Sequence, residues 1–119
     1  MCSLVEIENG GYVADIKHKY IINIADAAKD CKNISRIMLF GSATQTRCTE
    51  SSDIDIAVFG RKKRNEYLRS GEFKSFQRKL FSFGDVSQDY DILYFCDGKT
   101  CDDSIMRDIN GGTEIFRRV

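Results

Sequence analysis

Three short apolar runs, each closed by glycine or a turn-like pair, constrain the fold of this chain most strongly. They are Ile34–Phe40, residues 53–59 and Tyr90–Cys96. Gly41 directly follows the first run and Gly60 the second. Short apolar runs that are rich in branched and aromatic residues and end at a glycine predict β-strands, buried on at least one face. We therefore expect three strands.

The segments between these runs have the spacing of helices. Residues 13–31 place apolar side chains three or four positions apart, which predicts an amphipathic helix. Residues 62–83 mix basic and apolar side chains and predict a helix that is interrupted near Ser70-Gly71. A further helix is expected over residues 102–110, beginning near Asp102 or Asp103 and stopped by Gly111-Gly112.

The order of these elements predicts the fold class. Residues 113–119 add a short final strand, so strands alternate with helices along the chain. This order is typical of a small α/β (α+β) fold with a mixed β-sheet and helices packed against it. The chain has no proline and no low-complexity segment or internal repeat. We therefore expect residues 1–119 to form a single domain.

Composition and charge exclude several classes of function. The chain is 42% hydrophobic and 30% charged, as expected for a folded protein, and its basic and acidic residues balance at 18 each. Zero formal charge gives no general electrostatic argument for nucleic-acid or membrane binding. No run reaches the roughly 20 apolar residues that span a bilayer, and residues 1–11 do not resemble a secretory signal. Five cysteines without a Cys-x-x-Cys pair favour free thiols, so we expect a cytoplasmic protein.

Three carboxylates lie within the predicted strands. Asp53 and Asp55 are two residues apart, so on a strand their side chains project from the same face. Asp91 lies in the third strand and Asp89 shares its alternation, but only Asp91 has strand residues on both sides and we favour it. Carboxylates in apolar strands need compensation, and a divalent cation such as Mg²⁺ or Mn²⁺ supplies it. The alternative is that Asp53 and Asp55 flank a loop and face solvent.

The Gly41-Ser42 pair predicts a phosphate-binding turn. A glycine directly after an apolar strand permits a tight turn and lets a ligand approach the backbone. A serine at the start of a helical turn adds a hydroxyl and free backbone N–H groups, which suit phosphate. A Gly-Ser pair alone is usually only a turn, so the prediction depends on its combination with the carboxylates.

The combination of these motifs resembles the signature of the DNA polymerase beta-like nucleotidyltransferase superfamily. A ten-residue gap separates Ser42 from Asp53. The resemblance is carried by Phe40-Gly41-Ser42, by Ser52-Asp53-Ile54-Asp55-Ile56-Ala57-Val58 and by Tyr90-Asp91-Ile92-Leu93. The short chain is similar to the minimal nucleotidyltransferases of that group, so we expect the polymerase beta-like nucleotidyltransferase fold.

The resemblance implies a function and a set of site residues. Gly41 and Ser42 would contact the triphosphate of a nucleoside triphosphate, with ATP favoured. Asp53, Asp55 and Asp91 would be the catalytic residues and the ligands of two magnesium ions, with manganese as a substitute. Members of the group transfer a nucleoside monophosphate, often AMP from ATP, to a hydroxyl group on a protein, nucleic acid or small molecule. The sequence names neither the acceptor nor the oligomeric state.

The run after Ser42 departs from the family pattern. Minimal members commonly carry an arginine soon after the Gly-Ser pair, whereas this chain has Ala-Thr-Gln-Thr over residues 43–46 and then Arg47. Arg47 is the candidate replacement for nucleotide binding. The basic run at residues 61–64 is expected near the mouth of the site, although a solvated loop is its commoner meaning.

This departure keeps two other hypotheses open. The minimal group resembles antitoxins paired with all-helical HEPN toxins, so the chain is alternatively a non-catalytic or weakly catalytic antitoxin or regulatory protein that binds such a partner. A third hypothesis is a nucleotide-binding sensor that keeps the pocket without turnover.

Overall fold

The computed structural model describes residues 2–8, 10–85, 87–97 and 104–118. Its elements are, in chain order, β1 (Leu4–Glu6), β2 (Tyr12–Ala14), the 3-10 turn η1 (Asp15–Lys17), α1 (His18–Lys29), β3 (Ile34–Phe40), the 3-10 turn η2 (Gly41–Thr44), β4 (Ile54–Gly60), α2 (Arg64–Leu68), α3 (Gly71–Phe81), β5 (Tyr90–Cys96), α4 (Ser104–Asn110) and β6 (Thr113–Arg117).

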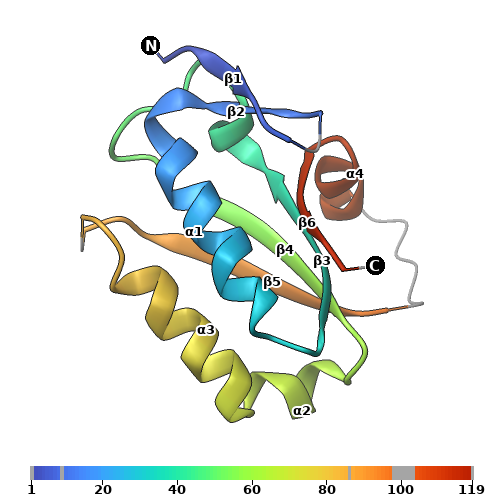
Figure 1. Ribbon diagram of the computed structural model, residues 1–119. Coiled ribbons are helices and arrows are strands. Elements are labelled where there is room, and N and C mark those ends of the chain that lie inside the picture. The colour runs from blue at the N-terminus through green and yellow to red at the C-terminus, as the bar shows by residue number, and fades with distance from the viewer. Residues whose placement is uncertain (1, 9, 86, 98–103, 119) are drawn as a thin grey trace.

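A mixed four-stranded sheet with the order β5-β4-β3-β6 forms the centre of the molecule (Figure 1). Strand β3 runs antiparallel to both β4 and β6, whereas β4 and β5 are parallel. Strands β1 and β2 form a separate antiparallel pair. The predicted fold class, a small mixed sheet with helices packed against it, is confirmed.

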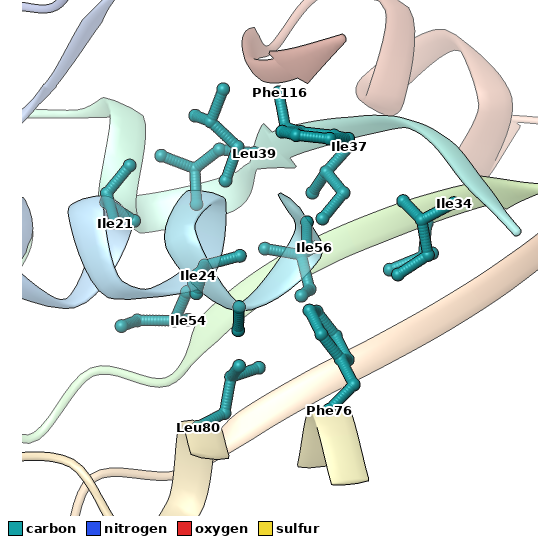
Figure 2. Close-up of a cluster of buried hydrophobic side chains, with 14 of the residues drawn as sticks. Ile21, Ile24, Ile34, Ile37, Leu39, Ile54, Ile56, Phe76, Leu80 and Phe116 are labelled. Atoms are coloured by element: carbon teal, nitrogen blue, oxygen red, sulfur yellow. The ribbon is translucent and has the colours of Figure 1, made fainter. Parts of the chain in front are cut away.

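The main core lies between the sheet and the helices α1 and α3. Alternate residues of β4 face these helices, with Ile54 and Ile56 fully buried. Figure 2 shows these two side chains among Ile24 of α1 and Phe76 and Leu80 of α3. The helix spacing in the sequence produces this layer, because the apolar face of α1 is buried.

The opposite face of the sheet carries a smaller cluster. It contains Met106 and Ile109 of α4, packed with Ala57 and Phe59 of β4. Asp55 has the same alternation as Ala57 and Phe59, so it belongs to this second face. Helices α1 and α3 and the Asp55 side chain therefore lie on opposite sides of the sheet.

Two sequence predictions are corrected at the N-terminal side. Leu4–Glu6 and Tyr12–Ala14 form β1 and β2, which the sequence does not predict. Val13 lies in β2 and Asp15 opens η1, so α1 begins at His18 and not at residue 13. The apolar spacing of the helix continues into the strand, because Val13 is buried in the main core although it belongs to β2 and pairs with Val5.

The predicted interruption of the long helix is confirmed. Helix α2 ends at Leu68 and α3 begins at Gly71. Ser70 caps α3, because its hydroxyl accepts a hydrogen bond from the Phe73 N–H at 3.1 Å. The strand predicted over residues 53–59 is shifted by one residue, and the predicted start of the last helix at Asp102 or Asp103 lies outside the described residues. No helix in the described part of the chain is long and apolar enough to cross a membrane.

Candidate active site

The predicted site residues meet at one end of the sheet. Strand β3 finishes there at Phe40, and β4 and β5 begin there. Asp55 is the second residue of β4; it pairs with Phe40 on one side and with Asp91 on the other. In a parallel pair, residues in register project from the same face, so Asp55 and Asp91 stand side by side. Asp53 directly precedes β4 and is exposed.

The Asp55 carboxyl group is the least solvated of the three. Its side chain is half-buried, whereas Asp53 and Asp91 are exposed. Burial raises the pKa of the Asp55 carboxyl group, and the negative charges of Asp91 and Asp53 raise it further. None of the described residues forms an ion pair with these three carboxylates. The end of the sheet therefore concentrates negative charge, and none of the described cationic side chains is in direct contact with it.

Gly41 joins the turn to the carboxylates. Its φ is 74°, a left-handed conformation that glycine adopts without strain. A Cβ at this position would overlap Oδ2 of Asp55 and lie 3.3 Å from its Cγ. The backbone of Gly41 therefore packs directly on the Asp55 carboxylate, and the two halves of the sequence motif touch in space.

The residues after Gly41 form a compact turn. The hydroxyl of Thr44 donates to the Gly41 carbonyl at 2.8 Å, and the Gln45 N–H donates to the Ser42 carbonyl at 2.9 Å. The Ser42 side chain is half-buried and Ala43 is fully buried. Arg47 is exposed, and its Nε donates to the side chain of Gln45. The structure thus places the Gly41-Ser42 turn beside Asp55. Arg47 forms no ion pair with Asp53, Asp55 or Asp91 among the described residues.

The basic run at residues 61–64 does not lie near the site, and this prediction is wrong. It follows the last residue of β4, Gly60, whereas Asp55 lies near the first. Five strand residues at a rise of about 3.3 Å separate Asp55 from Gly60 by roughly 16 Å. At that far end Arg61 donates to the Lys32 carbonyl at 3.0 Å.

Asp91, and not Asp89, is the carboxylate beside Asp55. The pairing of β4 with β5 aligns Asp55 with Asp91, whereas Asp89 lies before β5 begins. The Asp89 carbonyl accepts a hydrogen bond from the Ile54 N–H at 3.0 Å, which continues the pairing by one residue. The exposed Asp89 side chain therefore precedes the strand and does not lie beside Asp55.

The three carboxylates do not enclose a metal site as they stand. Within residues 2–8, 10–85, 87–97 and 104–118, no three carboxylate, thiol or imidazole side chains are grouped closely enough to hold a metal ion. Asp53 lies outside the strand ladder, and like charges repel one another where nothing neutralises them. The donor chemistry nevertheless fits a hard divalent cation, because Asp55 is half-buried among carboxylates and has no protein cation as partner.

Sequence reasoning does not identify two buried polar residues next to the site. Lys17 is 1% exposed and Gln88 is 7% exposed. One signal for Lys17 was available, because it precedes Tyr20 and Ile24 by three and seven residues and so shares the apolar face of the helix pattern. Gln88 has no such signal, since it lies in an irregular segment before β5.

The fold brings the Gly-Ser turn against a carboxylate of the Asp-x-Asp pair at one end of the sheet. The family described as "Polymerase beta, Nucleotidyltransferase" matches residues 22–86, more than half of the 119 residues. The chain belongs to this family, within the DNA polymerase beta-like nucleotidyltransferase superfamily. The matched segment contains Gly41, Ser42, Asp53 and Asp55 and ends before Asp91. No curated protein matches the sequence.

The raised pKa of Asp55 predicts a pH-dependent stability effect. The folded state keeps the Asp55 proton to a higher pH than the unfolded state does. The free energy of unfolding therefore falls as pH rises from the ordinary aspartate pKa to the raised one. This loss of stability persists at neutral pH, where the carboxylate is charged in both states. Asp55→Asn is expected to raise the thermal midpoint at pH 7 in the presence of a chelator. The difference should shrink at pH 3, which thermal scans at both pH values measure.

Two controls identify the cause of this effect. Asp89→Asn changes an exposed carboxylate outside the site and should leave the midpoint unchanged. Mg²⁺ should raise the midpoint of the wild type and not that of Asp55→Asn, since a ligand stabilises only the state that binds it. A wild type more stable than Asp55→Asn at pH 7 without metal would contradict the electrostatic interpretation.

Proposed function

We propose that this protein is a metal-dependent nucleotidyltransferase that transfers a nucleoside monophosphate, with AMP from ATP favoured, to a hydroxyl acceptor. A partner protein is one candidate acceptor. The observation that carries the proposal is the contact of Gly41 with the Asp55 carboxylate, together with the alignment of Asp55 with Asp91. Membership of the nucleotidyltransferase family supports the reaction class.

Each site residue has a role in this proposal. Asp53, Asp55 and Asp91 would hold two Mg²⁺ ions, with Mn²⁺ as an alternative. Such cations neutralise triphosphate charge and lower the pKa of an attacking hydroxyl group. Gly41 and Ser42 would receive the triphosphate, because the absence of a Cβ at Gly41 lets this turn lie directly against the Asp55 carboxylate. Asp91, which is exposed beside Asp55, accepts the proton of the acceptor hydroxyl.

In this reaction the acceptor oxygen forms a bond to the α-phosphorus of the nucleotide. The bond between that phosphorus and the bridging oxygen of the pyrophosphate breaks, and pyrophosphate leaves with the electron pair. Catalysis of such a step depends mainly on positioning and charge stabilisation. The half-buried Asp55 carboxylate suits this role, because the Gly41 backbone lies directly against it at the end of the sheet.

The proposal is tested by incubating the protein with ATP labelled on the α-phosphate, Mg²⁺ and a candidate acceptor. We expect label on the acceptor and an equal amount of pyrophosphate. Asp53→Ala should lose both, and Asp89→Ala should keep both, since Asp89 is exposed and precedes β5. Replacing ATP by the other nucleoside triphosphates measures the nucleotide preference. Absence of pyrophosphate with every acceptor and nucleotide would contradict the enzymatic proposal.

The turn after Gly41 favours a second candidate function. Turn η2 has the sequence Gly-Ser-Ala-Thr and therefore no cationic side chain, and Arg47 is engaged by Gln45 at the surface. A weaker hold on the triphosphate suits a non-catalytic or weakly catalytic antitoxin or regulatory protein that binds a HEPN-type helical partner. A stable complex with such a partner that survives Asp55→Ala, without pyrophosphate release, would favour this function.

A further inference from the structure

A buried ammonium group lies next to the candidate active site. Lys17, the last residue of η1, is 1% exposed, and no other charged side chain in the described part of the chain is buried to this degree. Burial lowers the pKa of the Lys17 ammonium group, while nearby negative groups, Asp53 among them, act in the opposite direction. A lysine is costly to bury, so its hydrogen-bond partners indicate its role.

The Lys17 ammonium group connects two segments that are far apart in the sequence. Its Nζ donates to the Glu50 carbonyl at 3.0 Å and to Oε1 of Gln88. Glu50 belongs to the segment between η2 and β4, which ends at Asp53. Gln88 belongs to the segment that leads into β5 and Asp91. The contacts of one side chain therefore join the two segments that deliver carboxylates to the site.

The Gln88 side chain extends this connection toward the carboxylates. Its Nε2 donates to the Ser52 carbonyl at 3.2 Å and to the Asp89 carbonyl at 2.7 Å, while its Oε1 accepts from Lys17. The amide thus uses its donors and its acceptor, which fixes its orientation. Ser52 directly precedes Asp53, and Asp89 lies two residues before Asp91. We refer to Lys17 and Gln88 together as the Lys17–Gln88 clip.

The position of Lys17 excludes a direct role with substrate. A side chain that is 1% exposed and donates to two protein oxygens cannot also reach a bound triphosphate in this conformation. Lys17 contacts the backbone carbonyl of Glu50 and the side chain of Gln88, which lie in the segments that precede Asp53 and Asp91. Its effect on the site is therefore through the placement of other residues.

We propose that Lys17 is a positioning residue, and that the Lys17–Gln88 clip sets the position of Asp53 relative to Asp55 and Asp91. This inference depends on the proposed function of the carboxylates as metal ligands. The clip is suited to the task because the backbone ladder holds Asp55 and Asp91 in register, whereas Asp53 lies outside it. Residues that orient metal ligands typically change metal affinity about 10- to 100-fold when they are replaced.

The test is the affinity of the full chain for Mn²⁺, measured by electron paramagnetic resonance without nucleotide. Lys17→Met keeps an unbranched side chain, one atom shorter, and removes its charge, and we expect it to weaken Mn²⁺ binding at least tenfold. Lys19→Met, at a neighbouring exposed lysine, should bind Mn²⁺ like the wild type. Hydrogen exchange of the Ile54 amide, which donates to the Asp89 carbonyl, should become faster in Lys17→Met and not in Lys19→Met.

Two further variants separate positioning from a general loss of stability. Ile24→Val trims the core on α1, away from the clip, and should lower the thermal midpoint without changing Mn²⁺ affinity. Gln88→Met removes the amide and keeps Lys17, and should also weaken Mn²⁺ binding at least tenfold. If Lys17→Met does not fold, the Mn²⁺ affinity of Gln88→Met tests the positioning role in its place.

The outcomes distinguish this inference from the proposed function. Mn²⁺ binding that is absent in the wild type, or equal in Asp55→Asn, would contradict the proposed metal site itself. Mn²⁺ binding that requires Asp55 but is equal to wild type in folded Lys17→Met or Gln88→Met would overturn the positioning role. If Ile24→Val has the same thermal midpoint as a clip variant and binds Mn²⁺ equally weakly, a general loss of stability explains the effect. That result would also overturn the positioning role.

Discussion

Asp55→Asn is expected to lower the rate of nucleotidyl transfer about 10³-fold. The variant keeps the size of the side chain and removes its charge. Asp55 is the most buried of the three carboxylates and is the one that Gly41 contacts. Electrostatic stabilisation by bound cations is worth several kcal/mol, and about 4 kcal/mol corresponds to about 10³-fold in rate. The measurement is the initial rate of pyrophosphate release with ATP and Mg²⁺.

The control for this prediction is Asp89→Asn, because it changes an aspartate two residues before Asp91 that does not align with Asp55. Its rate should remain within about twofold of the wild type. Circular dichroism should show both variants folded. Transfer by Asp55→Asn at more than a tenth of the wild-type rate would be incompatible with Asp55 as a metal ligand.

Gly41→Ala is expected to reduce both stability and transfer. A left-handed φ costs a residue with a Cβ about 1–2 kcal/mol, and the new Cβ would also displace the Asp55 carboxylate. A displacement of about 1 Å at a reacting group lowers the rate about 100-fold. Urea denaturation and pyrophosphate release measure the two effects separately.

Two other glycines separate backbone strain from displacement of Asp55. Gly10 also has a positive φ, 88°, but an added Cβ there would contact nothing within 4 Å. Gly10→Ala should therefore lose stability and keep transfer. Gly71, the first residue of α3, has neither feature, so Gly71→Ala should change little. If Gly41→Ala lost only as much transfer as Gly10→Ala, the contact with Asp55 would have no catalytic importance.

The elements that the sequence predicts well are those in which local and tertiary preferences agree. Strand β3 is predicted at both ends, because an apolar run meets Gly41 and the turn there needs a positive φ. Strand β5 is predicted at both ends as well. Ser70 is a good N-cap residue, so the break between α2 and α3 can be inferred from the local sequence.

The elements that were missed depend on distant partners. Strands β1 and β2 have three residues each, and three residues show too little alternation to identify a strand. Lys17 has the helix spacing of a core residue, but only the fold brings Glu50 and Gln88 to its ammonium group. Sequence spacing does not specify such long-range polar contacts.

The error over residues 61–64 has a different origin. Asp55 begins a strand and Arg61 follows its end, so strand geometry alone separates them. Asp55 and Arg61 are close in the sequence, but an extended strand holds residues this far apart at opposite ends. Asp91 shows the reverse case, since the parallel pairing of β4 and β5 brings it beside Asp55 from 36 positions away.

The placement of charge along the sheet gives this electrically neutral chain a dipole. Asp53, Asp55 and Asp91 gather where β4 begins, and the basic run at residues 61–64 follows where β4 ends. The field of the carboxylates opposes the approach of a free triphosphate and favours one that already carries a divalent cation. Dissolved salt screens this repulsion and this attraction at distances beyond about 10 Å. A nucleotide that reaches this end of the sheet as its magnesium complex therefore meets the smaller electrostatic barrier.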